Sequence, residues 1–207
     1  MKKKLLILFG LFSLITIINT ISCTKCEGGG TKKVIDIRAV MTGAQYSPQD
    51  PNKMMYFDIT NDTIYYSFLG IIIQPEMTTA SNLNTYNSFG FINAAYACDP
   101  VIPTTNDKIT QIEIVADQDY NDSHPKGSDL AEYFDVVVTY AHTNTYDEKY
   151  DLKEYLGRKP LVPDEMTLIL KTKPKQDTKF VFTLNYKQDG VSFSSKKIVF
   201  DPVTVTQ

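Results

Sequence analysis

The chain of 207 residues is 43% hydrophobic and 22% charged, and it carries a formal net charge of −3. Three of its 21 basic side chains, Lys2, Lys3 and Lys4, precede an apolar stretch, so the remainder of the chain is more acidic than the total suggests. Nucleic-acid binding requires clustered Lys and Arg, and the sequence holds no such cluster after this start. Composition therefore favours one ordinary globular domain and disfavours a nucleic-acid partner.

Residues 1–22 have the features of an export signal. The three lysines are followed by a largely apolar stretch at 5–18, which is shorter than the roughly 20 residues that an α-helix needs to cross a bilayer. The small residue Ser22 ends the segment. We therefore expect residues 1–22 to be a signal peptide that is removed on export.

Residues 19–23 resemble the lipobox of bacterial lipoproteins, with Ser22 directly before Cys23. Thr20 stands where the usual pattern has leucine, a change that the looser lipoboxes of Bacteroidetes tolerate. The resemblance implies that Cys23 is lipidated, and several acyl chains hold a protein persistently on a membrane. Thr24 is not the aspartate that retains enterobacterial lipoproteins at the inner membrane, so we expect the protein to be anchored in the outer membrane. The sequence leaves open whether its domain faces the periplasm or the outside. The alternative is secretion with a free Cys23.

A tether is expected after this cysteine. Three consecutive glycines at 28–30 have no side chains to pack, so residues 23–33 are predicted to be a flexible linker. Residues 34–207 would then form a single domain, with no internal repeat and no second boundary.

The remaining two cysteines form a candidate disulfide. If Cys23 is lipidated, Cys26 and Cys98 are left as a pair in an oxidising compartment. The alternative is that Cys26 stays mobile and Cys98 packs as a small buried hydrophobic residue.

Alternating apolar and polar residues predict strands through most of the domain. The predicted strands are 34–41, 55–59, 63–73, 89–97, 109–116, 133–140, 166–172, 179–186, 191–200 and 203–206. Short helical turns are expected at 127–132 and at 151–157, where Asp151 is a suitable N-cap. Strands this frequent with so little helix predict an all-β fold, an antiparallel β-sandwich of immunoglobulin-like type.

Catalytic motifs are missing from the sequence. Neither His124 nor His142 lies in a recognisable motif, and no nucleophile elbow, phosphate loop or zinc-protease signature is present. The sequence therefore predicts a protein that is not an enzyme and that uses no cofactor or metal. A cleft with one of these histidines beside a carboxylate and a hydroxyl would revive a hydrolase reading.

The acidic loop at 117–124 begins like a calcium-binding loop, because carboxylate and amide oxygens alternate along it. Its sixth position is Asp122 instead of glycine, and its twelfth is Ser128 instead of a bidentate glutamate. We expect a turn in which Asp and Asn side chains bind their own backbone, with a weak cation site as the alternative.

The chain has thirteen tyrosines, many of them predicted in loops. They favour glycan binding as an alternative function, because sugar rings stack on aromatic faces. The absence of tryptophan counts against this function. Residues 62–64 resemble the short O-glycosylation signal of exported Bacteroidetes proteins, which implies Thr63 as the modified residue; alternatively, Thr63 is a β-branched residue that opens a strand.

Four stretches, 96–100, 109–114, 119–121 and 127–130, together resemble a family of uncharacterised Bacteroidetes lipoproteins known only as a domain of unknown function. The resemblance implies a cellular context and no reaction. We expect a lipid-anchored outer-membrane lipoprotein that acts as a non-enzymatic binding or structural module of the cell envelope, with an envelope protein as partner. The alternative is a glycan-binding accessory lipoprotein of a polysaccharide uptake system.

Overall fold

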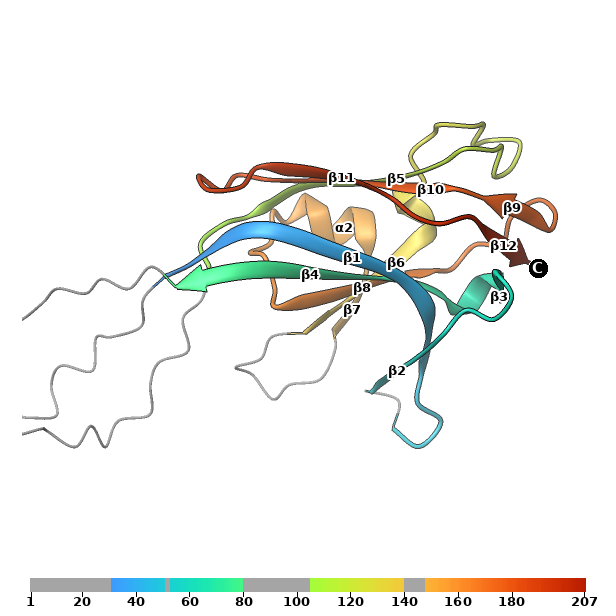
Figure 1. Cartoon of the computed structure of the whole chain (residues 1–207), viewed down its shortest axis with the longest axis horizontal. Coiled ribbons are helices and arrows are strands. Elements are labelled where there is room, and N and C mark those ends of the chain that lie inside the picture. The colour runs from blue at the N-terminus through green and yellow to red at the C-terminus, as the bar shows by residue number, and fades with distance from the viewer. Residues whose placement is uncertain (1–30, 51–52, 80–104, 140–147) are drawn as a thin grey trace, which may run out of the picture. The chain divides into compact units, whose positions relative to one another are not determined.

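The computed structural model describes residues 31–50, 53–79, 105–139 and 148–207. The strands belong to one unit, formed by Lys32–Thr79 and Thr105–Gln207. Figure 1 shows this unit as two layers of strands, with the blue and green strands β1 and β4 in one layer and β5, β10 and β11 in the other.

The larger layer is a six-stranded sheet in which every neighbouring pair is antiparallel. Its strands, in spatial order, are β2 (Met54–Phe57), β1 (Lys32–Tyr46), β4 (Leu69–Thr79), β8 (Glu165–Leu170), β6 (Phe134–Thr139) and β7 (Glu148–Asp151). β1 is the longest of them, and its last residues pair with β2, which forms the edge of the sheet.

The second layer consists of two three-stranded sheets. The first is antiparallel and holds β11 (Ser195–Val199), β10 (Phe182–Gln188) and β5 (Ile109–Ala116). In the other, β12 (Val203–Thr206) lies between β9 (Thr178–Phe180) and β3 (Thr63–Tyr65), and its pairing with β3 is parallel.

The core lies between the layers and follows from the alternation of the strands. Along β5, Ile112 and Ile114 are buried while Gln111 and Glu113 reach the partly exposed face. The neighbouring strand β10 adds the fully buried Phe182 and Tyr186, and the facing sheet adds Phe134, Ile71 and Leu168. The predicted fold class, an all-β antiparallel sandwich, is confirmed.

Helical structure is limited to short pieces in the described residues. The helix α2 (Leu152–Gly157) begins where predicted, because the Asp151 carboxylate accepts a hydrogen bond of 3.1 Å from the N–H of Glu154. The 3-10 turns η1 (Tyr66–Phe68) and η2 (Ala131–Tyr133) complete the set. None of the helices described is long and apolar enough to span a membrane.

Several strand bounds differ from the prediction. The predicted strand 63–73 is divided by η1 into β3 and β4, and the predicted strand 191–200 begins only at Ser195. β7 was not predicted, because its sequence Glu-Lys-Tyr-Asp holds no β-branched residue. The predicted strand 89–97 lies outside the described residues.

Candidate functional site

Two hollows of nearly equal volume open on the sandwich, at about 450 Å³ and about 460 Å³. We name the first the acidic hollow, because Asp58, Asp62 and Asp201 line it. We name the second the paired hollow, because the charged residues in its lining, Asp135, Lys149 and Lys171, form ion pairs.

The acidic hollow lies between two open strand edges. Its walls include residues 39–41 of β1 and residues 198–199 of β11. β2 pairs with β1 only at residues 43–46, so no described strand covers the outer edge of β1 at 39–41. β11 is the last strand of its sheet. Strand edges of this kind present unpaired backbone N–H and C=O groups.

An ion pair ties these two edges together beside the hollow. The ammonium of Lys196 on β11 lies 2.7 Å from a carboxylate oxygen of Asp36 on β1. This hydrogen bond is the main reason that the pKa of the Asp36 carboxyl is lowered, and the N–H of Ile37 adds to it. The contact joins the two layers at Asp36 and Lys196, and the hollow opens further along both strands, at residues 39–41 and 198–199.

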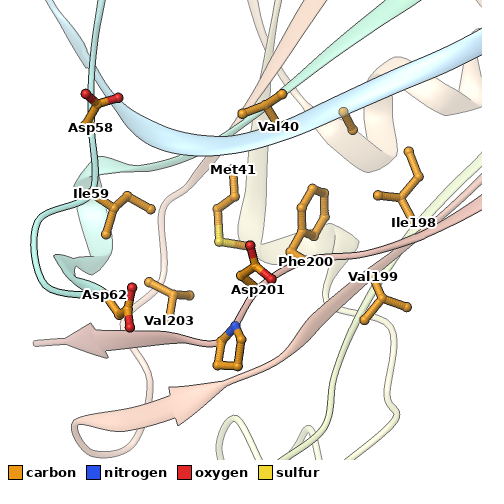
Figure 2. A pocket seen from close by; sticks show the side chains of 12 residues that line it. Val40, Met41, Asp58, Ile59, Asp62, Ile198, Val199, Phe200, Asp201 and Val203 are labelled. Atoms are coloured by element: carbon orange, nitrogen blue, oxygen red, sulfur yellow. The ribbon is translucent and has the colours of Figure 1, made fainter.

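The floor of the acidic hollow is apolar and its rim is charged. Figure 2 shows Asp58, Ile59 and Asp62 on the segment between β2 and β3, and Asp201 on the link between β11 and β12. The apolar side chains of the lining are less exposed than these three aspartates, and they include Met41, Ile59, Ile198, Phe200 and Val203. At the rim, Val40 and Val199 are 58% and 60% exposed.

A tight turn fixes Asp62 at this rim. Asn61 and Asp62 both have positive φ, at 54° and 52°, as a two-residue turn of type I′ requires. The N–H of Thr63 donates to the C=O of Thr60 at 3.1 Å and closes the turn. The C=O of Asp62 accepts from the N–H of Thr204 at 2.6 Å, so β12 holds the turn in place.

The carboxylates of the acidic hollow are nearly without counterions. In the described part of the chain, Lys179 is the one cation at ion-pair distance, 4.0 Å from Asp62. Within the same residues, no hydrogen bond or ion pair reaches the carboxylate of Asp58 or Asp201. Three like charges therefore face one apolar hollow with almost no local neutralisation.

Exposed rings lie on both sides of the segment between β2 and β3, and we name them the aromatic cluster. Its members Phe57, Tyr65 and Phe68 are 40%, 42% and 37% exposed. The ring of Phe68 lies 6.1 Å from that of Phe57 and 5.9 Å from that of Tyr65, at interplanar angles of 75° and 57°. Phe57 covers Gly43, where a β-carbon would overlap its ring.

The paired hollow has a different charge arrangement. Asp135 lies 2.8 Å from Lys149 and 3.1 Å from Lys171, and Lys171 also binds Asp151. Hydrogen bonding to Lys171 is the largest cause of the lowered pKa of Asp151. Burial opposes the charge of Lys171, yet Asp151 and Asp135 raise its pKa above the ordinary value. These charges join β6, β7 and β8 across the sheet.

His124 belongs to a separate hydrogen-bonded group. Its Nδ1 lies 2.8 Å from the hydroxyl of Tyr133, and its Nε2 lies 2.9 Å from Glu132. The ammonium of Lys153 binds Glu132 and is the main reason that the pKa of this carboxyl is lowered. A carboxylate, a histidine and a hydroxyl thus meet as the hydrolase reading requires, but none of them lines either hollow. The group holds η2 against the acidic loop.

The acidic loop itself forms the predicted kind of turn. The amide oxygen of Asn121 accepts from the N–H groups of Ser123 and His124, and the Asp119 carboxylate accepts from the N–H of Lys126. Asp122 instead forms an ion pair with Lys175. The described residues contain no group of three or more acidic, histidine or cysteine side chains placed to hold a metal ion.

Of the residues predicted to carry the lipid, the disulfide and the glycan, only Thr63 is described. It is exposed at the start of β3, and its hydroxyl donates to the C=O of Asn61 at 3.1 Å. Cys23, Cys26 and Cys98, which carry the lipid and disulfide predictions, lie outside the described residues, as does His142.

Fold and site together define a class, an all-β sandwich whose surface carries an acidic hollow and exposed aromatic rings. A family model, the domain of unknown function DUF5034, matches residues 60–190, which is more than half of the chain. The chain belongs to this family. No curated protein and no solved structure matches it. Most of the acidic hollow, including Asp58 and Asp201, lies outside the matched range.

Sequence reasoning did not find Asp58 or Asp201. Each lies at the end of a strand where an aspartate is an ordinary turn residue. They belong to one hollow only because β11, β12 and the link after β2 meet in the folded state. The one local signal was the Asn61-Asp62 turn, which places a carboxylate at the rim.

Proposed function

We propose that this protein is a lipid-anchored outer-membrane lipoprotein of the Bacteroidetes type, held by Cys23, whose sandwich is a non-enzymatic module that binds another envelope protein. The aromatic cluster is the observation that carries the binding role. Three adjacent rings, each more than a third exposed, form an apolar surface of the kind that marks protein contacts.

The angles between the rings favour a protein over a glycan as the partner. A sugar-binding platform needs faces that lie in one plane, and the rings of Phe57 and Tyr65 are inclined to Phe68 by 75° and 57°. Inclined rings instead form a surface into which a complementary side chain packs. We therefore rank the glycan-binding alternative second.

Photo-crosslinking in intact cells tests the binding role. Phe68 in the full chain is replaced by a benzophenone amino acid, and the same replacement at Val191, which is fully exposed on the β10–β11 link, is the control. The proposal expects one discrete protein adduct at position 68 and none at position 191. Identical adduct patterns at the two positions, or an adduct only with polysaccharide, would contradict it.

The anchor is tested separately by Cys23→Ala. The proposal expects the variant to lose labelling by radioactive palmitate and to leave the membrane fraction, while wild-type protein stays in it. A variant that remains labelled and membrane-bound would exclude Cys23 as the lipidation site.

A further inference from the structure

The acidic hollow combines an apolar floor, two open strand edges and two carboxylates, those of Asp58 and Asp201, that have no counterion among the described residues. We propose that it receives an extended segment of the protein partner, and that this segment places a lysine or arginine side chain in the hollow. This inference rests on the proposed binding function and names the chemistry of the partner.

The open edges specify an extended peptide. On an antiparallel strand, alternate residues direct their N–H and C=O groups away from the neighbouring strand, and along residues 39–41 no described strand accepts them. Val40 and Val199 are the exposed apolar residues beside the hollow. A strand added to such an edge would pair its backbone and cover an exposed valine.

The floor and the rim together specify a basic side chain. Lysine and arginine have a long aliphatic stem that packs on apolar surface and a charged head that stays at the polar rim. Met41, Ile59 and Val203 offer the apolar surface. Asp58 and Asp201 offer two carboxylates that pair with no described residue. A neutral or acidic side chain would leave those charges unpaired or add repulsion.

Peptide selection on the full chain, held in detergent, tests the inference. A phage library of random octapeptides is selected on wild-type protein, on the double variant Asp58→Asn and Asp201→Asn, and on Glu154→Gln. Asparagine matches aspartate in shape, and the substituted side chains have no partner to lose among the described residues. Glu154→Gln is the control away from the hollow, because it removes one exposed negative charge from α2, where Glu154 pairs with Arg158.

Wild-type protein and the control are expected to enrich peptides with a lysine or arginine flanked by apolar β-branched residues. The double variant is expected to bind the leading peptide about tenfold more weakly, as for the loss of two close charge contacts. Replacing the arginine of that peptide by citrulline, which keeps its shape and removes its charge, should give a similar loss.

Enrichment without a basic residue, equal binding by the double variant, or no enrichment on wild-type protein would each overturn the inference. None of these results would affect the crosslinking test at Phe68, so failure of the basic-segment inference is distinguishable from failure of the binding function. If adducts form at Phe68 while no basic peptide is selected, the protein has a partner that does not use the hollow.

Discussion

The acidic hollow and the paired hollow differ in charge, although their volumes are nearly equal. In the paired hollow, Asp135 is bound by two lysines, and one of these also holds Asp151. In the acidic hollow, Asp58 and Asp201 have no partner among the described residues. Mutual pairing stabilises the fold, whereas like charges left together oppose it slightly.

The difference separates stability from binding. The charges of the paired hollow lie on β6, on β7 and at Lys171 directly after β8, and they hold strands that are distant in sequence. The charges of the acidic hollow lie on connecting segments, and among the described residues only Asp62 has a cation, Lys179, at ion-pair distance. Charges that add no stability to the fold can serve the binding role proposed for the acidic hollow. Substitutions in each of the two hollows test this difference.

The largest effect is expected at Lys171. Lys171→Met leaves Asp151 without its cation and removes one of the two cations on Asp135, so the free energy of unfolding should fall by about 2 kcal/mol. Urea unfolding measures this loss. Lys173→Met is the control, because Lys173 is exposed and its one side-chain hydrogen-bond partner among the described residues is Gln207, at a long 3.4 Å. An equal loss in both variants would contradict the stabilising role of the paired hollow.

The two functions of Asp151 can be separated next. Asp151→Asn removes the charge that binds Lys171 but keeps an oxygen that caps α2, whereas Asp151→Ala removes both. The free energy of unfolding of the alanine variant should be about 1 kcal/mol lower than that of the asparagine variant, which is the usual contribution of an N-cap. Equal stability of the two variants, measured by thermal and urea unfolding, would show that the cap contributes nothing.

Acid should weaken the same ion pair. The pKa of Asp151 in the folded protein lies below its ordinary value of 3.8, mainly because of the hydrogen bond from Lys171. Its contribution to stability is therefore present at neutral pH and is lost in the acidic range, as pH falls through the lowered pKa of the folded protein. Lys171→Met should lose less stability over this range than wild type. Unfolding curves with the same slope against pH would contradict the assignment.

The smallest effect is expected in the acidic hollow. Asp58→Asn and Asp201→Asn remove charges that pair with no described residue, so each should change the free energy of unfolding by less than about 0.5 kcal/mol. Asp135→Asn is the comparison variant from the paired hollow, where a larger loss is expected. A large loss at Asp58 or Asp201 would mean that the acidic hollow contributes to the stability of the fold.

Strands with clean alternation were predictable from sequence. β5 and β12 have the predicted bounds, because buried and more exposed positions alternate through all of β12 and through β5 from Gln111 onward. The interruption at η1 was not predictable, since Tyr66-Ser67-Phe68 continues an apolar pattern that also suits a strand. Likewise, Val181 separates β9 from β10, and its N–H donates to the distant Asp117 carboxylate.

The candidate site was predictable only in part. Asp151 was predicted from its capping position, and Asn-Asp is an ordinary residue pair for the turn observed at Asn61-Asp62. The hollow and the aromatic cluster depend on contacts between segments far apart in the chain, which no local pattern specifies. The exposure of Phe57 also depends on Gly43, which lies on another strand.

The most direct test of the central claim measures both the free energy of unfolding and the peptide affinity of the double variant Asp58→Asn and Asp201→Asn. The expected result is a free energy of unfolding within about 0.5 kcal/mol of wild type and an affinity for the selected basic peptide that is about tenfold lower. A variant that loses stability but binds the peptide with unchanged affinity would contradict the assignment of the acidic hollow to binding.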